Sequence, residues 1–457
     1  MPATSLPGPS GSVPQAVPDV PGARVDEQRS ESLKAHVAKL CQLQHTRFPG
    51  AQPVSFTKAS LDLLLTEDFW VCEKSDGQRV LVLIAWNKFA HRQEVFLIDR
   101  KNIYREQSRA LFFPHFEKPR GKPEDRIVQD IGSRWKALHE TVLDGELVWD
   151  TLKDGRRKLR LLLFDALVID GQNMASRTLE KRYGRLQAYV YKPFVDFMRE
   201  NPQRARDMDF EIFVKTMDLG YGIQAVLKDR IPRLEHGNDG LIFTCITSGY
   251  TCGTDSKIIK WKPPYENTID FKLRLRFPPD LAVDPRGNVP DLSAKPFFAL
   301  DQFVGRERGS TSDGYEYFDW LHVEDDEWEQ MKASGQQFDD VVVEVSWDLK
   351  GGPLSADGEP TPGWRLHRVR DDKHDGNHHT IVQKIITSIE DGVEEDELVG
   401  AEQEMRRAWK SEERTRIRKA GLVQSRTEAP SRPEAPAGRR MGPGPPMRGV
   451  PPPGLKR

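Results

Sequence analysis

Between residues 80 and 261, many of the hydrophobic positions gather in short apolar runs, and few long amphipathic repeats interrupt these runs. The runs have the length and the β-branched or aromatic content of strands, and Gly, Asp, Pro or charged residues separate them. The run LLLFDALVI at 161–169 is almost continuously apolar, which predicts a strand buried on both faces, whereas the strand at 94–98 is predicted to be half exposed. The predicted strands are 80–86, 94–98, 142–149, 160–169, 241–244 and 258–261.

Two segments of this first part have helical periodicity. Residues 31–47 place apolar side chains from Leu33 to Leu43 at spacings of three and four, which predicts a helix that opens the fold. Apolar and aromatic residues recur among charged ones at 179–199, which predicts a second helix. A few helices among many strands indicate an α+β fold.

A second β-rich segment follows the sequence WKPPYE at 261–266. Two prolines cannot continue a strand ladder, so we expect a hinge there. The size of segment 270–389 suits a small barrel, such as an OB fold with insertions. Its strand-like runs are 270–276, 341–347 and 364–370, and its Gly-rich or acidic connections are 306–314 and 323–340. Residues 394–419 turn from acidic to basic along one predicted helix, the order that a helix dipole favours.

Composition separates the two ends from the body. Of 33 prolines, six lie in residues 1–24 and nine in 424–457, which is typical of disordered tails. The formal net charge is −2, yet residues 405–457 hold 14 Lys and Arg against four Asp and Glu. A uniformly basic nucleic-acid coat is therefore excluded. The predicted organisation is a disordered arm at 1–28, a first domain at 29–266, a barrel domain at 267–392, a helix at 393–420 and a disordered basic tail at 421–457.

The sequence gives no sign of a membrane segment. The longest strongly apolar stretch, at 80–86, is far shorter than the roughly 18 residues of a spanning helix, and the N-terminus lacks a hydrophobic signal core. We expect a soluble intracellular protein with no membrane partner.

The sequence EKSDGQR at 73–79 is the most informative short motif. It places the amine of Lys74 on a tight turn, with the acid of Asp76 and the guanidinium of Arg79 beside it, just ahead of an apolar strand. That arrangement suits a nucleophile, although a surface turn is the commoner explanation of such a motif when it is taken alone.

Four further motifs occur at predicted strand ends, in the order DGEL, FDA, DGLIF and KWK. Together with EKSDGQR they resemble the covalent nucleotidyltransferases, the superfamily of mRNA capping enzymes and ATP-dependent polynucleotide ligases. WRLHRVRDDK at 364–373 is similar to the sixth motif of that superfamily. The resemblance implies an ATP-grasp-like nucleotidyltransferase domain followed by a β-barrel OB-fold domain, between Pro-rich disordered termini.

The flanking sequences look like the fungal mRNA guanylyltransferase subunit, and ligases do not share them. The pieces are FPGAQPVSF at 48–56, FLIDRKNIYR at 96–105, HGNDGLIFT at 236–244 and the stretch from DGNHHTIVQKI to residue 392. The resemblance implies that Lys74 attacks the α-phosphorus of GTP, holds GMP as a phosphoramidate and passes it to a 5′-diphosphate RNA end.

A lysine nucleophile needs the neutral amine, which is scarce at neutral pH because an ordinary lysine pKa is about 10.4. Lys260 and Lys262, alternate residues of one predicted strand, share a face and could both aim at the α-phosphate. Their charges would repel a proton on Lys74 and offset charge in the transition state.

The resemblance also implies the remaining site residues. Arg79 and Glu146 would bind the ribose hydroxyls, Arg100 the ribose or a phosphate, Phe164 would stack on guanine, Lys215 would donate to the guanine oxygen, and Asp239 would hold Mg²⁺ or Mn²⁺. Phe164 fits a core position equally well. Arg368, Arg370, Asp372 and Lys373 would orient the β- and γ-phosphates when the two domains close.

The implied partners are the 5′-diphosphate RNA, a separate RNA 5′-triphosphatase subunit and the phosphorylated C-terminal domain of RNA polymerase II, in the nucleus. A scaffold that docks on the transcription machinery is the alternative from another class, and labelling by ATP would indicate a ligase. Four histidines within residues 367–379 are not expected to bind zinc, because no Cys or helical framework accompanies them. The basic tail is a hypothetical RNA tether.

Overall fold

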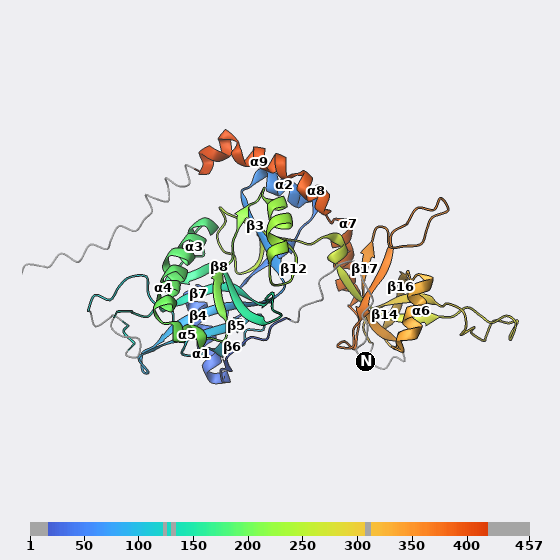
Figure 1. Cartoon of the computed structure of the whole chain (residues 1–457), viewed down its shortest axis with the longest axis horizontal. Helices are drawn as coiled ribbons and strands as arrows, with labels where there is room; N and C mark the ends of the chain where they lie inside the picture. Colours follow the sequence, from blue (N-terminus) through green and yellow to red (C-terminus); the bar gives the residue numbers. More distant parts are fainter. Residues whose placement is uncertain (1–16, 122–125, 129–133, 307–311, 419–457) are drawn as a thin grey trace, which may run out of the picture. The chain divides into compact units, whose positions relative to one another are not determined.

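The computed structural model describes residues 17–121, 126–128, 134–306 and 312–418, and Figure 1 shows their order along the chain. The chain divides after Arg407 into two compact units. The predicted tail at 421–457 and residues 1–16 of the predicted disordered arm lie outside the described residues, as does the centre of the predicted 306–314 connection. Residues 17–28 of that arm are described and include a short strand at Ala23–Arg24 and the start of a helix at Glu27.

The first sheet has the strand order β1-β6-β5-β4-β7-β8-β10, with β9 paired to β8. All its pairs are antiparallel except that of β8 with β10. Its strands are β1 (Ala23–Arg24), β4 (Gln78–Asn87), β5 (Arg92–Asp99), β6 (Tyr104–Glu106), β7 (Thr141–Thr151), β8 (Arg157–Ile169), β9 (Gln172–Asn173) and β10 (Glu211–Val214).

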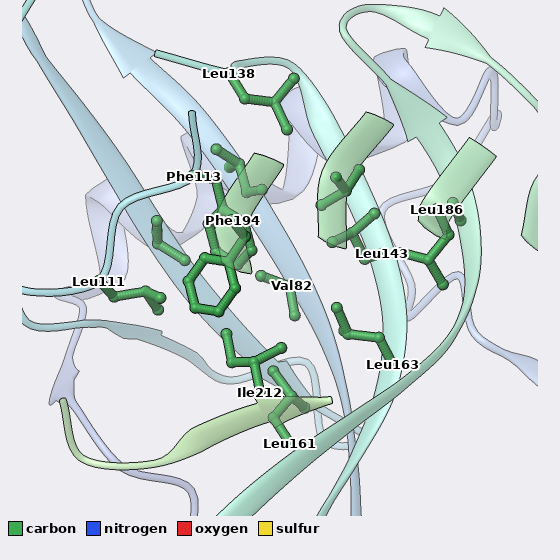
Figure 2. Close-up of a cluster of buried hydrophobic side chains, with 14 of the residues drawn as sticks. Val82, Leu111, Phe113, Leu138, Leu143, Leu161, Leu163, Leu186, Phe194 and Ile212 are labelled. Carbon is green, nitrogen blue, oxygen red and sulfur yellow. The ribbon is translucent and has the colours of Figure 1, made fainter. Parts of the chain in front are cut away.

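Helical segments cover one face of this sheet. The predicted helix at 179–199 is α3 (Leu179–Arg185), a π-helical stretch at Leu186–Tyr191 and α4 (Lys192–Glu200), followed by the short α5 (Pro202–Arg206). Figure 2 shows Leu186 and Phe194 among strand side chains such as Leu143 and Leu163, in one buried cluster. The Phe194 ring stacks on that of Phe113, with 5.1 Å between centroids.

The opposite face of the first sheet packs on α1 (Glu27–Leu40), which begins and ends earlier than the predicted 31–47. Here the prediction for 94–98 was wrong. Val95 and Leu97 enter the cluster on one face while Phe96 and Ile98 enter that on the other, so the strand is buried on both sides. The covering helix lies some 60 residues away in sequence, and no local pattern announces it.

The second sheet has the order β11-β3-β12-β13-β2. Its strands are β2 (Ala51–Ser55), β3 (Phe69–Ser75), β11 (Asp218–Leu219), β12 (Asn238–Cys245) and β13 (Gly253–Trp261). Its buried cluster also takes side chains from α2 (Lys58–Thr66) and from the π-helical stretch Ala225–Arg230, which a 3-10 turn at Ile231–Arg233 follows. The central side chain is the fully buried Trp261.

The predicted break after Trp261 is a short connection with a 3-10 turn at Pro264–Glu266, and a ring of five strands follows it. The order is β14-β15-β16-β18-β17, with β17 pairing back onto β14. A single parallel pair, Leu321 with Trp364, joins β16 to β18 and closes the ring. The strands are β14 (Thr268–Arg276), β15 (Phe297–Phe303), β16 (Tyr315–Leu321), β17 (Val341–Asp348) and β18 (Gly363–Val369).

Two helices pack on the core of this barrel, α6 (Asp325–Ser334) and α7 (His379–Glu390). The acidic segment 323–340 was predicted to be a connection, and that prediction was wrong over α6. Three acidic residues in the first turn and a capping box between Glu324 and Glu327 favour the helix start, because carboxylates suit the positive end of the helix dipole.

The single helix predicted at 394–419 is interrupted. The structure has α8 (Glu395–Gly400) and α9 (Glu402–Lys410), with a break at Ala401. Val393, Leu398 and Met405 are buried in the cluster of the second sheet, and the Trp261 indole donates to the carbonyl of Val393 at 2.8 Å. The break lets the segment follow that core.

Within the described ranges, no helix has both the length and the apolar character needed to cross a membrane.

Candidate active site

Lys74 stands at the end of β3, and the turn that follows it packs tightly. A Cβ on Gly77 would lie 2.3 Å from the carbonyl oxygen of Leu147, so only glycine lets the turn approach β7 this closely. The N–H of Asp76 donates to the carbonyl of Gly237 at 2.8 Å. The Lys74 side chain is therefore carried on a loop that is fixed from two sides.

Asp239 bridges two lysines. Its Oδ1 accepts from Lys74 Nζ at 2.5 Å and its Oδ2 pairs with Lys262 Nζ at 2.5 Å. The pairing of β12 with β3 is irregular between Asn238 and Leu241, and Gly240 has a φ of 140°, so a bulge re-aims the Asp239 side chain. Burial alone would raise the pKa of Asp239, but the charges of Lys74 and Lys262 lower it. The carboxylate stays ionised between its two partners.

Lys260 lies on β13 opposite Ile242 and is half-buried. Its pKa is lowered, first by burial and then by the charges of Lys74, Lys262 and Arg100. The structure thus places all three predicted catalytic lysines around one carboxylate, and Arg100, exposed after β5, contributes to the same positive field.

Arg79 is engaged with buried groups. Its Nε and Nη2 donate to the two oxygens of Asp144 at 3.0 and 2.6 Å, and its Nη1 donates to the carbonyl of Ala51. The Tyr250 hydroxyl also donates to Asp144, at 2.5 Å. The guanidinium lies 5.5 Å from the centroid of the Phe164 ring. Arg79 thereby links the two sheets beside a half-buried aromatic face.

Glu146 faces Arg79 in the β4–β7 register. Its pKa is raised by burial, against the lowering effect of Lys215, Lys74 and Arg79. Lys215, directly after β10, is buried, and its Nζ donates to Ser75 Oγ at 2.8 Å and pairs with Glu73 at 3.4 Å. The two predicted nucleotide ligands therefore share one buried polar region with Lys74.

The four predicted phosphate ligands on the barrel form a separate group. Arg368 donates to Glu344 at 2.7 Å, while Arg370 pairs with Asp372 at 2.8 Å and with Asp270 at 3.0 Å. Lys373 pairs with Asp270. The basic members of this group thus form ion pairs with carboxylates of the barrel domain, such as Glu344 and Asp270, and not with the carboxylates around Lys74.

The residues around Lys74 offer little to a metal ion. Across the described part of the chain, no group of three or more His, Cys, Asp and Glu could hold one. Asp239 supplies a single carboxylate, and both of its oxygens are paired with lysines. This donor set fits a cation that keeps its waters and arrives on phosphate oxygens, and it does not fit a metal caged by the protein alone.

Sequence reasoning missed four polar residues of the site: Asp144, Asp150, His236 and Ser75. Asp144 pairs with Arg79, and the other three form a hydrogen-bonded chain behind Lys74. Asp144 and Ser75 lie inside quoted motifs, so buried polar positions within strands were an available signal. His236 opens the quoted stretch HGNDGLIFT, whereas Asp150 had no such signal.

Family models match almost the whole described chain. The mRNA capping enzyme catalytic domain matches residues 16–264, and the mRNA capping enzyme C-terminal domain matches residues 266–399. These two matches define a nucleotidyltransferase-like domain followed by a capping C-terminal domain.

Curated relatives agree over the same extent. The mRNA-capping enzyme subunit alpha of Neurospora crassa is 38% identical over 406 residues, covering 85% of this chain and 93% of that protein. The same-named proteins of Schizosaccharomyces pombe and Saccharomyces cerevisiae are 36% and 34% identical, covering 90% and 86% of this chain and 94% and 87% of theirs. The chain belongs to the mRNA capping enzyme family, which confirms the resemblance found in the motifs.

Among solved structures, the ligase domain of LigD from M. tuberculosis aligns at a TM-score of 0.32 with 17% identity, over 71% of this chain and 95% of that one. Such a low TM-score adds nothing to the family assignment, which stands on the sequence matches.

Proposed function

We propose that the protein is an mRNA guanylyltransferase that works through a covalent lysyl-GMP intermediate on Lys74. The observation that carries the proposal is the placement of Lys74 Nζ within 2.5 Å of Asp239, with Lys260 and Lys262 beside them, in a chain of the mRNA capping enzyme family. An amine paired with a carboxylate, with two further lysines beside it, suits attack on a phosphate.

In the first step, the lone pair of Lys74 Nζ attacks the α-phosphorus of GTP. A bond from nitrogen to phosphorus forms, the bond from phosphorus to the bridging oxygen breaks, and pyrophosphate leaves. The nitrogen attacks as the neutral amine, and the positive charges of Lys260 and Lys262 lie beside it. The same two charges offset the charge that develops on the α-phosphoryl oxygens.

The second step returns the lysine. A terminal phosphate oxygen of a 5′-diphosphate RNA attacks the phosphorus of lysyl-GMP, the nitrogen–phosphorus bond breaks, and the cap is released. Glu146 and Arg79 would serve the ribose, Phe164 the base and Lys215 its oxygen. In this proposal the barrel is an OB fold that brings Arg368, Arg370, Asp372 and Lys373 to the outer phosphates of GTP.

A divalent cation, Mg²⁺ or Mn²⁺, would neutralise part of the triphosphate charge, with Asp239 as its protein ligand. Relatives with the name "subunit alpha" support a place in a multi-subunit enzyme. The other subunit would be an RNA 5′-triphosphatase, and docking to the phosphorylated polymerase tail in the nucleus completes the proposal.

The test is incubation of the purified chain with α-labelled GTP and Mg²⁺ or Mn²⁺, followed by denaturing electrophoresis. We expect a labelled band from GTP that pyrophosphate removes and 5′-diphosphate RNA discharges. Lys74→Ala should lose the band completely, whereas Lys181→Ala, a half-buried lysine of α3 outside the site, should keep it. A band from ATP in place of GTP, or an undiminished band from Lys74→Ala, would overturn the proposal.

A further inference from the structure

Behind Lys74, a chain of polar side chains connects three strands and a loop. His236 Nδ1 lies 2.8 Å from Asp150 Oδ1, and His236 Nε2 lies 3.2 Å from Ser75 Oγ. Lys215 Nζ donates to the same Ser75 oxygen at 2.8 Å. The His236, Asp150 and Lys215 side chains are each no more than 6% exposed. Because water hardly reaches these groups, the neighbouring protein groups determine the position of each hydrogen.

The donors and acceptors of this hydrogen-bonded series allow only one arrangement of its hydrogens. An ionised Asp150 can only accept, so His236 carries its hydrogen on Nδ1 and its Nε2 must accept from Ser75. Burial lowers the pKa of His236, which keeps the imidazole neutral. Glu73 is a poorer acceptor for the serine hydroxyl, because its oxygen is 3.5 Å away. Hydrogens therefore run from Lys215 through Ser75 and His236 to Asp150.

We infer that Asp150 and His236 are positioning residues that select guanine over adenine for the reaction at Lys74. They leave Lys215 as a donor and the remaining lone pair of Ser75 as an acceptor, side by side. Guanine presents the complementary pair, an acceptor at O6 beside a donor at N1, whereas adenine presents a donor at N6 beside an acceptor at N1. The inference rests on the proposed function.

The position of Ser75 supports this assignment. It directly follows Lys74 in the sequence, so its hydroxyl is fixed relative to the nucleophile, and Lys215 reaches it from β10. A hydroxyl can either donate or accept, so on its own it would suit both purines. Asp150, which would reach a ligand only through His236 and Ser75, removes that ambiguity.

Asp150→Asn is the sharpest test, since its amide can donate to His236 Nδ1. The hydrogen then moves to Nε2, which donates to Ser75 and turns the serine hydroxyl into a donor, the logic of a wrong histidine tautomer. We expect the KM for GTP in adduct formation to rise roughly tenfold, with little change in kcat. The ratio of kcat/KM for GTP over ATP should fall by a similar factor.

Glu235→Gln is the matched control. Asp150 and Glu235 both pair with Arg160, the latter at 3.0 Å, but of these two carboxylates it is that of Asp150 that hydrogen-bonds to the His236 ring. The control should keep the wild-type KM and preference. A second variant, His236→Gln, tests the relay without touching Arg160, and its freely rotating amide should also lower the preference for GTP.

A double-mutant cycle separates positioning from general damage. Ser75→Ala removes the hydroxyl that the relay orients, so Asp150→Asn should cost nothing further in that background. Additive losses, or an Asp150→Asn protein that behaves like Glu235→Gln, would overturn the inference. If Asp150→Asn lowers the melting temperature too far to be assayed, His236→Gln replaces it as the test. A His236→Gln protein with the wild-type preference for GTP over ATP would also overturn the inference. A wild-type chain that forms no GMP adduct would instead remove the proposed function, and this inference with it.

Discussion

Arg79 and Asp144 form a buried ion pair between neighbouring strands, β4 and β7, with Asp144 fully buried. Removal of one partner from such a pair leaves an uncompensated charge in a low-dielectric interior. We expect Asp144→Ala to lower the free energy of unfolding by about 3–5 kcal/mol, measured by urea denaturation followed by circular dichroism.

The matched control is Asp154→Ala, which breaks the exposed pair with Arg156 in the hairpin between β7 and β8. Solvent screens an exposed pair, so it contributes little and this variant should unfold close to the wild type. Equal effects of the two substitutions would contradict the importance of burial at Asp144.

The pH dependence of stability should also show the contribution of the ion pairs that Asp239 makes with Lys74 and Lys262. The pKa of Asp239 is lowered in the folded state, so its contribution is fully present above the unfolded pKa of about 3.9 and is lost as pH falls through the folded value. We expect Asp239→Asn to be less stable than wild type by a constant margin from pH 5 to 7. The margin should shrink below about pH 4. Thermal unfolding of both proteins at each pH measures this difference in stability. A difference that persists unchanged at pH 3 would argue against a stabilising role of the Asp239 ion pairs.

Residues with a local signal could be predicted from the sequence, and residues without one could not. Lys74, Lys260, Lys262 and Asp239 lie in short motifs. The structure pairs Lys74 and Lys262 with the Asp239 carboxylate and places Lys260 in the same electrostatic environment. His236 and Asp150 lie 86 positions apart, just before β12 of the second sheet and on β7 of the first, and only the folded arrangement of the two sheets brings them together. The roles of all these side chains remain predictions until the adduct and its variants are measured.

At the scale of elements, the turn after Lys74 depends on glycine. Gly77→Ala would place a Cβ 2.3 Å from the carbonyl oxygen of Leu147, so backbone must shift. We expect a loss of about 1–3 kcal/mol in unfolding free energy and a larger fall in adduct formation, because the shift moves Lys74 itself. Thermal melts and adduct yield on the same preparation measure both.

Gly184→Ala is the opposite case. This glycine lies inside α3 with open space around it, so alanine should be neutral or stabilising by about 0.4–1 kcal/mol. Its adduct yield should equal that of wild type. A Gly77→Ala protein as stable and active as Gly184→Ala would show that the turn tolerates displacement.

Element predictions failed where the deciding contact was distant. The segment 94–98 looked half exposed because its second cover, α1, precedes it by more than 50 residues. The helix at 394–419 was predicted as one piece because its charge gradient is continuous, whereas packing of Leu398 and Met405 on the second sheet sets a break at Ala401. The helix α6 did have a signal, its capping box, that the acidic composition concealed.

At the scale of the whole molecule, the chain returns to the second sheet after it has built the barrel. A chain that ends at residue 392 would lose Val393, Leu398 and Met405 from that core and expose the indole of Trp261. Truncation of a single buried leucine to alanine costs about 2–5 kcal/mol, so this loss should lower Tm by about 5 °C or more.

A chain that ends at residue 407 removes only the second compact unit and should melt within about 1 °C of the full chain. Differential scanning calorimetry of both truncations and of Leu398→Ala gives the comparison. Equal melting temperatures for the chains ending at 392 and 407 would show that the returning segment contributes no stability.

This return has a mechanical consequence. The chain enters the barrel next to Pro264 and leaves it next to Gly392, and a Cβ on Gly392 would lie only 2.9 Å from Pro264 Cγ. Because both chain ends of the barrel are held at this one place, the barrel can rotate about it but cannot translate away from it. Within the proposed function, the opening of the barrel that admits RNA is therefore expected to be a rotation about the contact between Pro264 and Gly392.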